Sequence, residues 1–255
     1  LQKTGLAERL LESSAKLFGS MSGGVAISTI IVGALLAAST GVVGASVVAM
    51  GVISLPVMIK NNYHQPTAAG VICASGTLGQ IIPPSIILII LGDVMGLPVG
   101  DLFKAAVIPG MMLIGAYVLY ILALSYVKPD FCPPIPVEED KMTILKQAAK
   151  DIVPPLLLIV VVLGSIFTGI ATPTESSAIG AVGALILAQF YGGVSFKTIF
   201  AVSKDSVKVS SMIFAVLIGA TAFSMVFSYS GGEYLVEEFF LSLPGEKWTF
   251  IILVM

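Results

Sequence analysis

The sequence predicts an all-α integral membrane protein, a polytopic helical bundle with a re-entrant helical hairpin and a discontinuous transmembrane helix. The chain of 255 residues is 56% hydrophobic and 11% charged, whereas soluble domains carry about 25% charged residues. Its apolar residues form helix-length runs, not the alternating segments of about ten residues that build an outer-membrane barrel. One run contains two glycines and two consecutive prolines, which an unbroken helix does not accommodate.

The interrupted run carries Ser-Gly-Thr-Leu-Gly-Gln-Ile-Ile-Pro-Pro-Ser at 75–85. Proline lacks a backbone N–H, and it moves the preceding residue away from helical angles. We therefore expect residues 66–97 to form a helix that is broken at membrane depth. Non-helical backbone at that depth persists only where protein or water surrounds it, and discontinuous helices mark the ion and substrate sites of transporters.

Residues 22–60 are predicted to form the re-entrant hairpin. Two apolar arms flank the uncharged stretch Ala-Ser-Thr-Gly-Val-Val-Gly-Ala-Ser at 38–46. Each arm has about 15–17 residues, roughly 25 Å at 1.5 Å per residue, which is at or below the lower limit for a full span. The tip carries hydroxyls and glycines and none of the charge of a loop in water, so we place it inside the membrane. Two ordinary short spans joined by a tight turn are the alternative.

The remaining segments predict surface helices and further spans. Residues 1–21 predict an amphipathic helix on a membrane surface or against a partner, and residues 129–151 a cytoplasmic loop with a surface helix. Thr172 to Glu175 fit a capping box at a helix start. The chain begins at Leu1 and ends in an apolar run, so we expect a piece of a longer protein. Full spans are expected at 102–127, 152–170, 173–191 and 209–230, with an incomplete segment from Trp248.

The basic residues predict the orientation, because Lys and Arg collect on the cytoplasmic side of membrane proteins. In this arrangement residues 1–21, 61–65, 128–151 and 192–208 are cytoplasmic, and residues 93–101, 171–172 and 231–247 are periplasmic. Of the 13 basic residues, only Lys104 and Lys247 then fall outside the cytoplasmic set. That set comprises Lys3, Arg9, Lys16, Lys60, Lys128, Lys141, Lys146, Lys150, Lys197, Lys204 and Lys208.

The two interruptions together predict a site that works through backbone dipoles. Freed carbonyls and Ser or Thr hydroxyls suit a small hard cation such as Na⁺, and helix N-termini suit a carboxylate. The alternative is that small residues only allow close helix packing in lipid. The candidate residues are Ser39, Thr40, Gly41, Gly44 and Ser46 in the tip and Ser75, Gly76, Thr77 and Gly79 in the break.

Three segments carry a resemblance to a known family. The pattern Gly-Thr-Leu-Gly-Gln-Ile-Ile-Pro-Pro-Ser at 76–85 resembles the signature of the large, DctM-like membrane subunit of tripartite ATP-independent periplasmic (TRAP) transporters. Ala-Ser-Thr-Gly-Val-Val-Gly-Ala-Ser-Val-Val-Ala-Met-Gly at 38–51 resembles the first hairpin tip of that family, and Gly-Ile-Ala-Thr-Pro-Thr-Glu-Ser-Ser-Ala at 169–178 is similar to a third segment. The resemblance covers nearly the whole chain.

The resemblance implies a Na⁺-coupled secondary transporter of the bacterial inner membrane, with an elevator-type fold of the ion-transporter superfamily and no cofactor besides the coupling ion. A periplasmic binding protein would deliver an organic acid, and a small four-helix membrane subunit, separate or fused, would brace the large one. Residues 22–128 would be the first repeat and 152–255 the start of an incomplete second one. The first sodium site would comprise Ser39, Thr40, Gly41, Ser46, Ser75, Gly76, Thr77 and Gly79.

The substrate wall implied by the resemblance comprises Ser39, Thr40, Gly44 and Thr77, and Pro83 and Pro84 would hold the break open. Many relatives carry an acidic residue in the tip after the serines, and this chain has none there.

Other functions stay open. The permease of an ATP-driven importer would need a coupling helix, for which residues 138–150 are the candidate, and a stand-alone ion-coupled carboxylate transporter is a further alternative. An intramembrane enzyme would need paired intramembrane aspartates, His-Glu-x-x-His or a Ser–His pair within one membrane level, which the sequence lacks, so no enzyme is predicted. A net charge of −2 makes nucleic acid an unsuitable partner.

Overall fold

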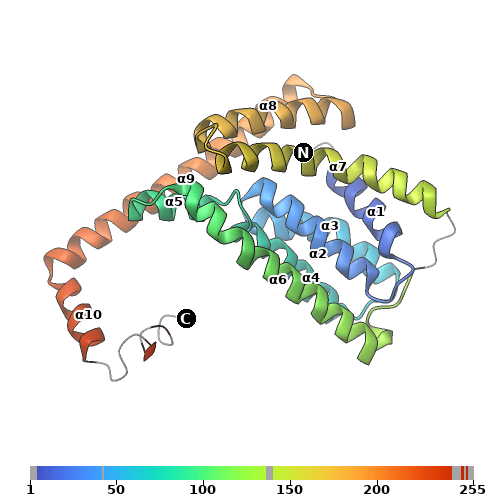
Figure 1. Ribbon diagram of the computed structural model, residues 1–255, viewed down its shortest axis with the longest axis horizontal. Helices are drawn as coiled ribbons and strands as arrows, with labels where there is room; N and C mark the ends of the chain where they lie inside the picture. The colour runs from blue at the N-terminus through green and yellow to red at the C-terminus, as the bar shows by residue number, and fades with distance from the viewer. Residues whose placement is uncertain (1–4, 42, 136–139, 243–247, 250, 252–255) are drawn as a thin grey trace. The chain divides into compact units, whose positions relative to one another are not determined.

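In the computed structural model, the described residues are 5–41, 43–135, 140–242, 248–249 and 251, and within them the chain is helical and forms no strand (Figure 1). The chain divides into two compact units, residues 1–194 and 195–255. The first unit contains α1 (Leu6–Phe18), α2 (Gly24–Thr40), α3 (Val43–Lys60), α4 (Gln65–Thr77), α5 (Ile86–Met95), α6 (Val99–Val127), α7 (Lys141–Phe167) and α8 (Pro173–Tyr191), with 3₁₀ turns η2 (Leu78–Gln80) and η3 (Pro129–Phe131). The second unit contains α9 (Phe196–Tyr229) and α10 (Gly232–Leu241).

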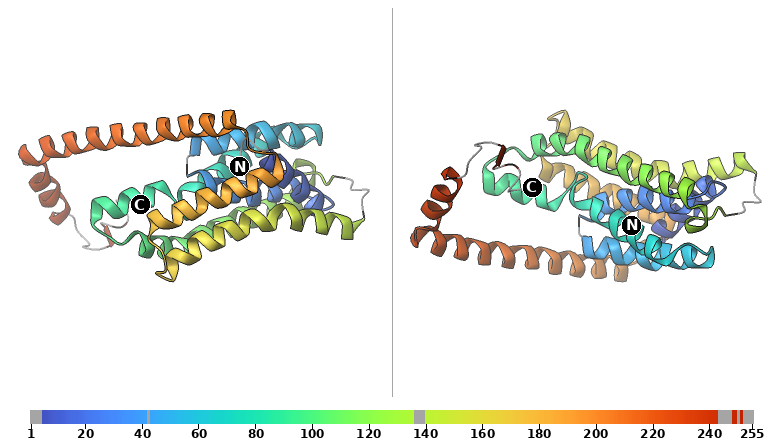
Figure 2. Two further views of the ribbon diagram at one scale, coloured as in Figure 1. Left: turned by 90° about the horizontal axis from the view of Figure 1, so that it is seen from above. Right: turned by 90° about the horizontal axis from the view of Figure 1, so that it is seen from below.

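The first unit is built around α2. This helix contacts α1, α3, α4, α6 and η2, and Figure 2 shows from two sides how α3 and α4 run beside it. A helix that is apolar on every face is stable only when it is covered on every face. Accordingly Val25, Ile30, Val32 and Leu36 are all nearly inaccessible. The hairpin arm predicted to lie within the membrane is therefore the core of the unit.

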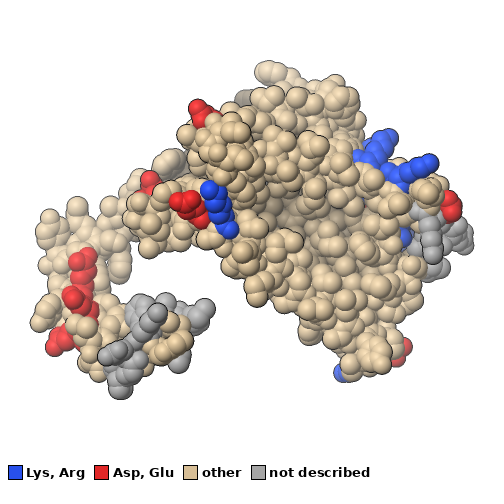
Figure 3. Space-filling view, viewed as in Figure 1, with Lys and Arg blue, Asp and Glu red and all other residues tan. Residues whose placement is uncertain are grey.

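Four helices in the described part of the chain are long and apolar enough to cross a membrane: α3, α6, α7 and α9. On the face of the first unit seen in Figure 3, the charged side chains gather toward the ends of the helices and leave the middle uncharged. The expected span at 173–191 forms α8, which is not among the four. Its first turn has the predicted capping box, in which Thr172 Oγ1 accepts from the Glu175 N–H and Glu175 Oε2 accepts from the Thr172 N–H. These polar residues lower the hydropathy of the segment.

Residues 1–21 were expected to form an amphipathic helix on a membrane surface or against a partner, and the structure supports the second alternative for α1. It packs against α2 and α7, and it buries Leu6, Leu10 and Leu11. A polar contact joins α1 to α7, because the Ser13 hydroxyl donates to the buried Asp151 carboxylate. The partner that the amphipathic pattern required is thus another part of the same chain.

The prediction that residues 129–170 contain a surface helix and a separate span is wrong, because both segments belong to one helix, α7. It runs unbroken from Lys141 to Phe167 through Pro154 and Pro155. Pro154 has no N–H for the Lys150 carbonyl one turn earlier. The Tyr191 hydroxyl of α8 donates to that carbonyl oxygen at 2.6 Å instead. The helix therefore continues because a neighbouring helix supplies the missing donor.

A second predicted boundary, between residues 208 and 209, is also wrong. The surface stretch expected at 192–208 and the span expected at 209–230 are one helix of 34 residues from Phe196 to Tyr229. Its length is about 51 Å at 1.5 Å per residue, well beyond a hydrocarbon core of about 30 Å. One continuous helix can thus carry an apolar span and a basic end that extends past the hydrocarbon. The apolar segment expected from Trp248 lies largely outside the described residues.

The loops at 61–65 and 128–135, both predicted to be cytoplasmic, pack together. The His64 and Phe131 rings stack with centroids 4.1 Å apart, and the backbone N–H of His64 donates to the Phe131 carbonyl oxygen at 3.1 Å. Cys132 is fully buried beside Tyr63. Burial, with the Cys132 thiol as a second cause, raises the pKa of Tyr63 to about 12 from an ordinary value of 10.0. This loop cluster closes one end of the hairpin.

The Ser13–Asp151 contact leads to a stability prediction for the full-length protein. Ser13→Ala removes one of the two donors to Asp151, the other being Gln147 Nε2 at 3.1 Å. A buried carboxylate that loses a donor is destabilised by about 1–3 kcal/mol. Thermal unfolding in detergent should show a lower midpoint for Ser13→Ala. Glu8→Ala, at an exposed position of the same helix, is the control. Equal midpoints for the two variants would contradict the assigned contact.

The Tyr63 pKa leads to a prediction on alkaline stability. Between pH 10 and about 12 the unfolded chain releases the Tyr63 proton while the folded chain retains it. The stabilisation is therefore complete below pH 10 and is lost as the pH rises through this range. Tyr63→Phe should flatten the decline in unfolding midpoint over that interval, measured in detergent. Tyr126→Phe, at a tyrosine that is 91% exposed, is the control. An unchanged decline in Tyr63→Phe would disprove the assignment.

Candidate functional site

The break predicted in residues 66–97 is present. Helix α4 ends at Thr77, the 3₁₀ turn η2 covers Leu78–Gln80, and α5 begins only at Ile86. The Pro83–Pro84 peptide bond, which is cis, lies between them. Ser85 is the N-cap of α5, and its hydroxyl accepts from the Leu88 N–H at 3.4 Å.

The two prolines free two carbonyl groups of the preceding turn. In a continuous helix, residues 83 and 84 would donate to the carbonyl oxygens of Gly79 and Gln80, but proline has no N–H. The Ser85 hydroxyl donates to the Gln80 carbonyl oxygen at 2.6 Å. The Gly79 carbonyl has no helical donor from Pro83, although Gly79 itself is buried. A buried carbonyl with spare lone pairs is a suitable ligand for a hard cation.

The hairpin tip lies against this break. Gly41 follows α2 in a left-handed conformation with φ +63°, which glycine adopts without strain. An added Cβ at this position would stand 3.0 Å from Cγ1 of Ile86, the first residue of α5. The point where the hairpin turns and the point where the broken helix resumes are therefore in contact.

A second contact joins the start of α3 to the end of α4. A Cβ added to Gly76 would lie 2.4 Å from Val47 Cγ2 and 2.9 Å from Val47 Cα. On the other arm, a Cβ added to Gly33 of α2 would lie 2.8 Å from the Ser75 hydroxyl oxygen. Glycine at 33 and 76 thus lets both hairpin arms approach the broken helix at backbone distance.

The hydroxyl groups in the break are oriented by their own helix. Ser75 Oγ donates to the Ile72 carbonyl oxygen at 3.0 Å, and Thr77 Oγ1 donates to the Ala74 carbonyl oxygen at 2.8 Å. A hydroxyl that donates its proton backward keeps its lone pairs for another ligand. Ser75 is completely buried, whereas Thr77 is exposed.

The predicted site residues separate by burial. Gly41, Ser46, Ser75, Gly76 and Gly79, all predicted for the cation, are buried. Gly44, predicted for the substrate, and Thr77, predicted for both the cation and the substrate, are exposed, and an added Cβ at Gly44 would meet open space.

The side chains of Ser39 and Thr40 lie outside the described part of the structure, although their backbone closes α2. Sequence reasoning omitted two residues: Gly33, one of several glycines in apolar runs, and Ser85, whose place after a double proline marks it as an N-cap.

The electrostatics of the site come from helix ends. Helices α2 and α4 end at Thr40 and Thr77, and these C-termini carry partial negative charge. Helices α3 and α5 begin at Val43 and Ile86, and these N-termini carry partial positive charge. The stretches 38–46 and 75–85 contain no Asp, Glu, Lys or Arg. Both signs are therefore available without an ionised side chain.

These features define a polytopic, all-α membrane protein with a helical hairpin packed on a discontinuous helix, an architecture typical of ion-coupled transporters. A family model described as the DctM component of the tripartite ATP-independent periplasmic transporter matches residues 1–255. The chain belongs to this DctM family of TRAP transporter large permease proteins.

Curated relatives agree with this family. The chain is 31% identical to a C4-dicarboxylate TRAP transporter large permease protein of Rhodobacter capsulatus, with 98% of the chain and 59% of the relative covered. The corresponding protein of Pseudomonas aeruginosa is 32% identical, with coverage of 98% and 58%. The chain therefore spans about three fifths of the length of these relatives.

The names of other relatives specify other cargoes. A sialic acid TRAP transporter large permease protein of Vibrio cholerae is 24% identical, with 100% of the chain and 59% of the relative covered. An isethionate TRAP transporter permease protein of Oleidesulfovibrio alaskensis, named DctMQ, is 28% identical, with coverage of 98% and 39%.

The contact at Gly76 gives a matched pair of glycine variants. Gly76→Ala places a methyl group into the Val47 backbone, and overpacking of this kind costs about 1–3 kcal/mol. Gly44→Ala meets open space, and alanine favours a helix by about 1 kcal/mol over glycine. In full-length protein we expect a lower unfolding midpoint for Gly76→Ala and an equal or higher one for Gly44→Ala. The reverse order would exclude the close packing of α3 on α4.

Proposed function

We propose that this chain is part of the large membrane subunit of a Na⁺-coupled TRAP transporter that imports an organic acid across the bacterial inner membrane. The observation that carries the proposal is the contact of the hairpin tip with the broken helix, at Gly41 with Ile86 and at Gly76 with Val47. In a DctM family member, two backbone interruptions that meet without an ionised side chain suit a pair of small ions of opposite charge.

The cation belongs among the buried oxygens in this proposal. The Gly79 carbonyl and the Ser75 hydroxyl offer lone pairs, and the C-termini of α2 and α4 add partial negative charge. Na⁺ requires oxygen ligands of this kind and needs no carboxylate when several of them converge. Ser39, Thr40, Gly41, Ser46, Gly76 and Thr77 complete the proposed set.

The organic acid belongs at the exposed side. Gly44 and Thr77 are exposed there, and the N-termini of α3 and α5 supply N–H donors and partial positive charge. C4-dicarboxylates, sialic acid and isethionate, which the names of relatives specify, are all organic anions. An anionic group is thus the shared chemistry that helix N-termini would recognise.

The partners follow from the family. A periplasmic binding protein would deliver the acid, and a small membrane subunit, separate or fused, would support the permease. The name DctMQ of one relative favours the fused option as one available arrangement. Because glycine contacts lock the hairpin to the broken helix, the two would move together with their cargo in an elevator-type step.

An ATP-driven importer fits less well. Its candidate coupling helix, residues 138–150, falls mainly within α7, which continues into an apolar span. The name of the matching family, the tripartite ATP-independent periplasmic transporters, also specifies ATP independence.

Reconstituted uptake tests the proposal. The full-length protein, with its small subunit, is placed in liposomes and supplied with binding protein loaded with a C4-dicarboxylate, sialic acid or isethionate in turn. We expect accumulation of at least one acid with an inward Na⁺ gradient and no ATP. Equal uptake after the Na⁺ gradient is replaced by K⁺ would exclude sodium coupling, and uptake that requires ATP would exclude the transporter class.

Two matched threonines test the cation site. Thr77 Oγ1 and Thr168 Oγ1 each donate to a carbonyl oxygen of their own helix at 2.8 Å, and both are exposed, but only Thr77 lies in the break. Loss of one ligand worth about 1.4 kcal/mol changes an affinity tenfold. Thr77→Val should therefore raise the Na⁺ concentration for half-maximal uptake about tenfold, and Thr168→Val should not. The same shift in both variants, or in neither, would remove Thr77 from the site.

A further inference from the structure

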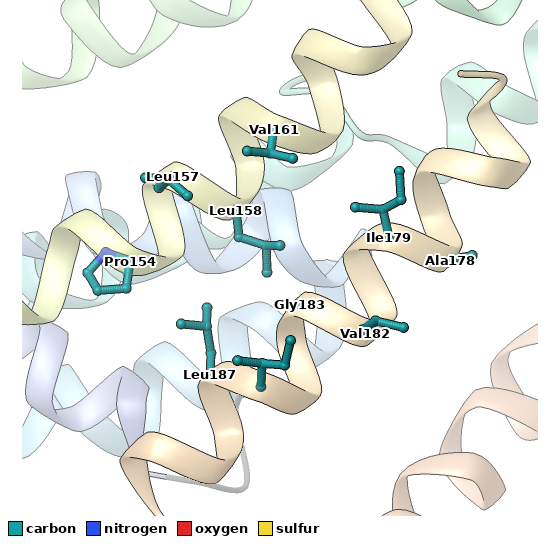
Figure 4. Close-up of a pocket in the computed structure, with 10 residues that line it drawn as sticks. Pro154, Leu157, Leu158, Val161, Ala178, Ile179, Val182, Gly183 and Leu187 are labelled. Atoms are coloured by element: carbon teal, nitrogen blue, oxygen red, sulfur yellow. The ribbon is translucent and has the colours of Figure 1, made fainter. Parts of the chain in front are cut away.

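A groove between α7 and α8 lies apart from the hairpin and the break. It has a volume of about 590 Å³, and its lining includes Pro154, Leu158 and Val161 of α7 and Ile179 and Val182 of α8 (Figure 4). Every residue along it is apolar. An apolar groove of this size on a membrane protein can hold hydrocarbon.

Basic residues continue the groove-lining face of α7. Residues at spacings of three and four share one side of a helix, so Lys146 and Lys150 extend the row that proceeds through Pro154 to Val161. Both lysines are exposed, and neither forms an ion pair within the described part of the chain. Figure 3 shows basic side chains gathered at the end of the first unit where α7 begins.

Aromatic residues at the C-terminal end of α8 lie near the lysines of α7. Tyr191 reaches α7 through its hydrogen bond to the Lys150 carbonyl oxygen, which fixes the register of the two helices. Phe190, beside it in sequence, is 83% exposed. Aromatic residues and snorkelling lysines are typical of the boundary between hydrocarbon and headgroups.

The dimensions match one leaflet. From Pro154 to Val161 the rise is about 10 Å at 1.5 Å per residue, within the half-thickness of about 15 Å of a hydrocarbon core. The lysines lie one and two turns beyond it, where a headgroup phosphate would be. The positive-inside rule assigns this end to the cytoplasmic leaflet, whose anionic lipids attract such clusters.

We propose that the α7–α8 groove binds an anionic phospholipid, with an acyl chain along the apolar lining and the phosphate between Lys146 and Lys150. An apolar helix from elsewhere in the assembly would fill the groove but would supply no negative charge to the two lysines. A phospholipid supplies both an acyl chain for the apolar lining and a negative charge for the two lysines.

The experiment measures lipids retained by the full-length protein. Protein exchanged into mixed phosphatidylglycerol and phosphatidylethanolamine is purified in mild detergent, and bound lipid is quantified by mass spectrometry. Wild type should retain phosphatidylglycerol preferentially. The double variant Lys146→Gln, Lys150→Gln should retain about tenfold less of it. Val182→Trp, which blocks the groove, should lose both lipids.

Two variants control for general effects. Lys104→Gln changes an exposed lysine elsewhere in the fold, and Ala181→Trp adds the same bulk to α8 at a position that does not line the groove. Both should retain lipid as wild type does. A phosphatidylglycerol with a photoreactive acyl chain should label peptides containing residues 154–161 and 178–187.

Three results would overturn the proposal. These are equal retention in the lysine double variant, equal retention in Val182→Trp, and labelling that avoids α7 and α8 because a protein helix covers the groove. Lipid retention does not require transport, so these results are independent of the sodium-coupling test.

Discussion

The fold depends on the absence of three side chains where the hairpin meets the broken helix. Gly33, Gly41 and Gly76 each face a neighbour at a distance that a Cβ would bring to 3.0 Å or less. Helices in lipid gain little from hydrophobic exclusion, so close backbone approach and dispersion provide much of their attraction. These contacts hold two irregular segments together, and each segment needs the other because unpaired peptide groups cannot face lipid. The glycines therefore determine whether the interruptions form a common site or two separate defects.

The chain contains two proline pairs, and their surroundings give them different outcomes. At 154–155 the helix continues, because Tyr191 donates to the carbonyl that Pro154 leaves free. At 83–84 the helix stops, and Ser85 caps the new helix while it donates to Gln80. The difference lies in the donors: Tyr191 of α8 supplies one to the turn before Pro154, whereas at Pro83 and Pro84 the Ser85 hydroxyl serves the Gln80 carbonyl and begins a new helix. The same dipeptide thus strengthens a helix contact in one place and opens a candidate ligand site in the other.

This contrast explains how much of the structure could be predicted from the sequence. The pair of helical arms, the break and the capping box at Thr172 were predicted correctly, because their signals are local: small residues, prolines and a cap. The placement of the tip inside the membrane stays a prediction. The partner of α1 was left open and the continuity of α7 was missed, because each depends on a neighbouring helix that periodicity does not show. The length of α9 was missed because its basic segment and its apolar span were read as separate elements. The placement of Ser75 opposite Gly33 is also tertiary. A glycine inside an apolar run has several explanations until the facing helix is known.

The division of the site into a buried and an exposed part bears on coupling in the proposed mechanism. Most of the residues proposed for the cation are buried, whereas Gly44 and Thr77 are exposed, and both sets lie at or near the ends of α2, α3, α4 and α5. A cation between the C-termini of α2 and α4 would draw the hairpin and the broken helix together. That movement would also position the N-termini of α3 and α5, which are the next α-helices in the chain after α2 and α4. Acid affinity would then depend on the cation through geometry alone. Since linkage is reciprocal, the acid would raise the affinity for the cation by the same factor.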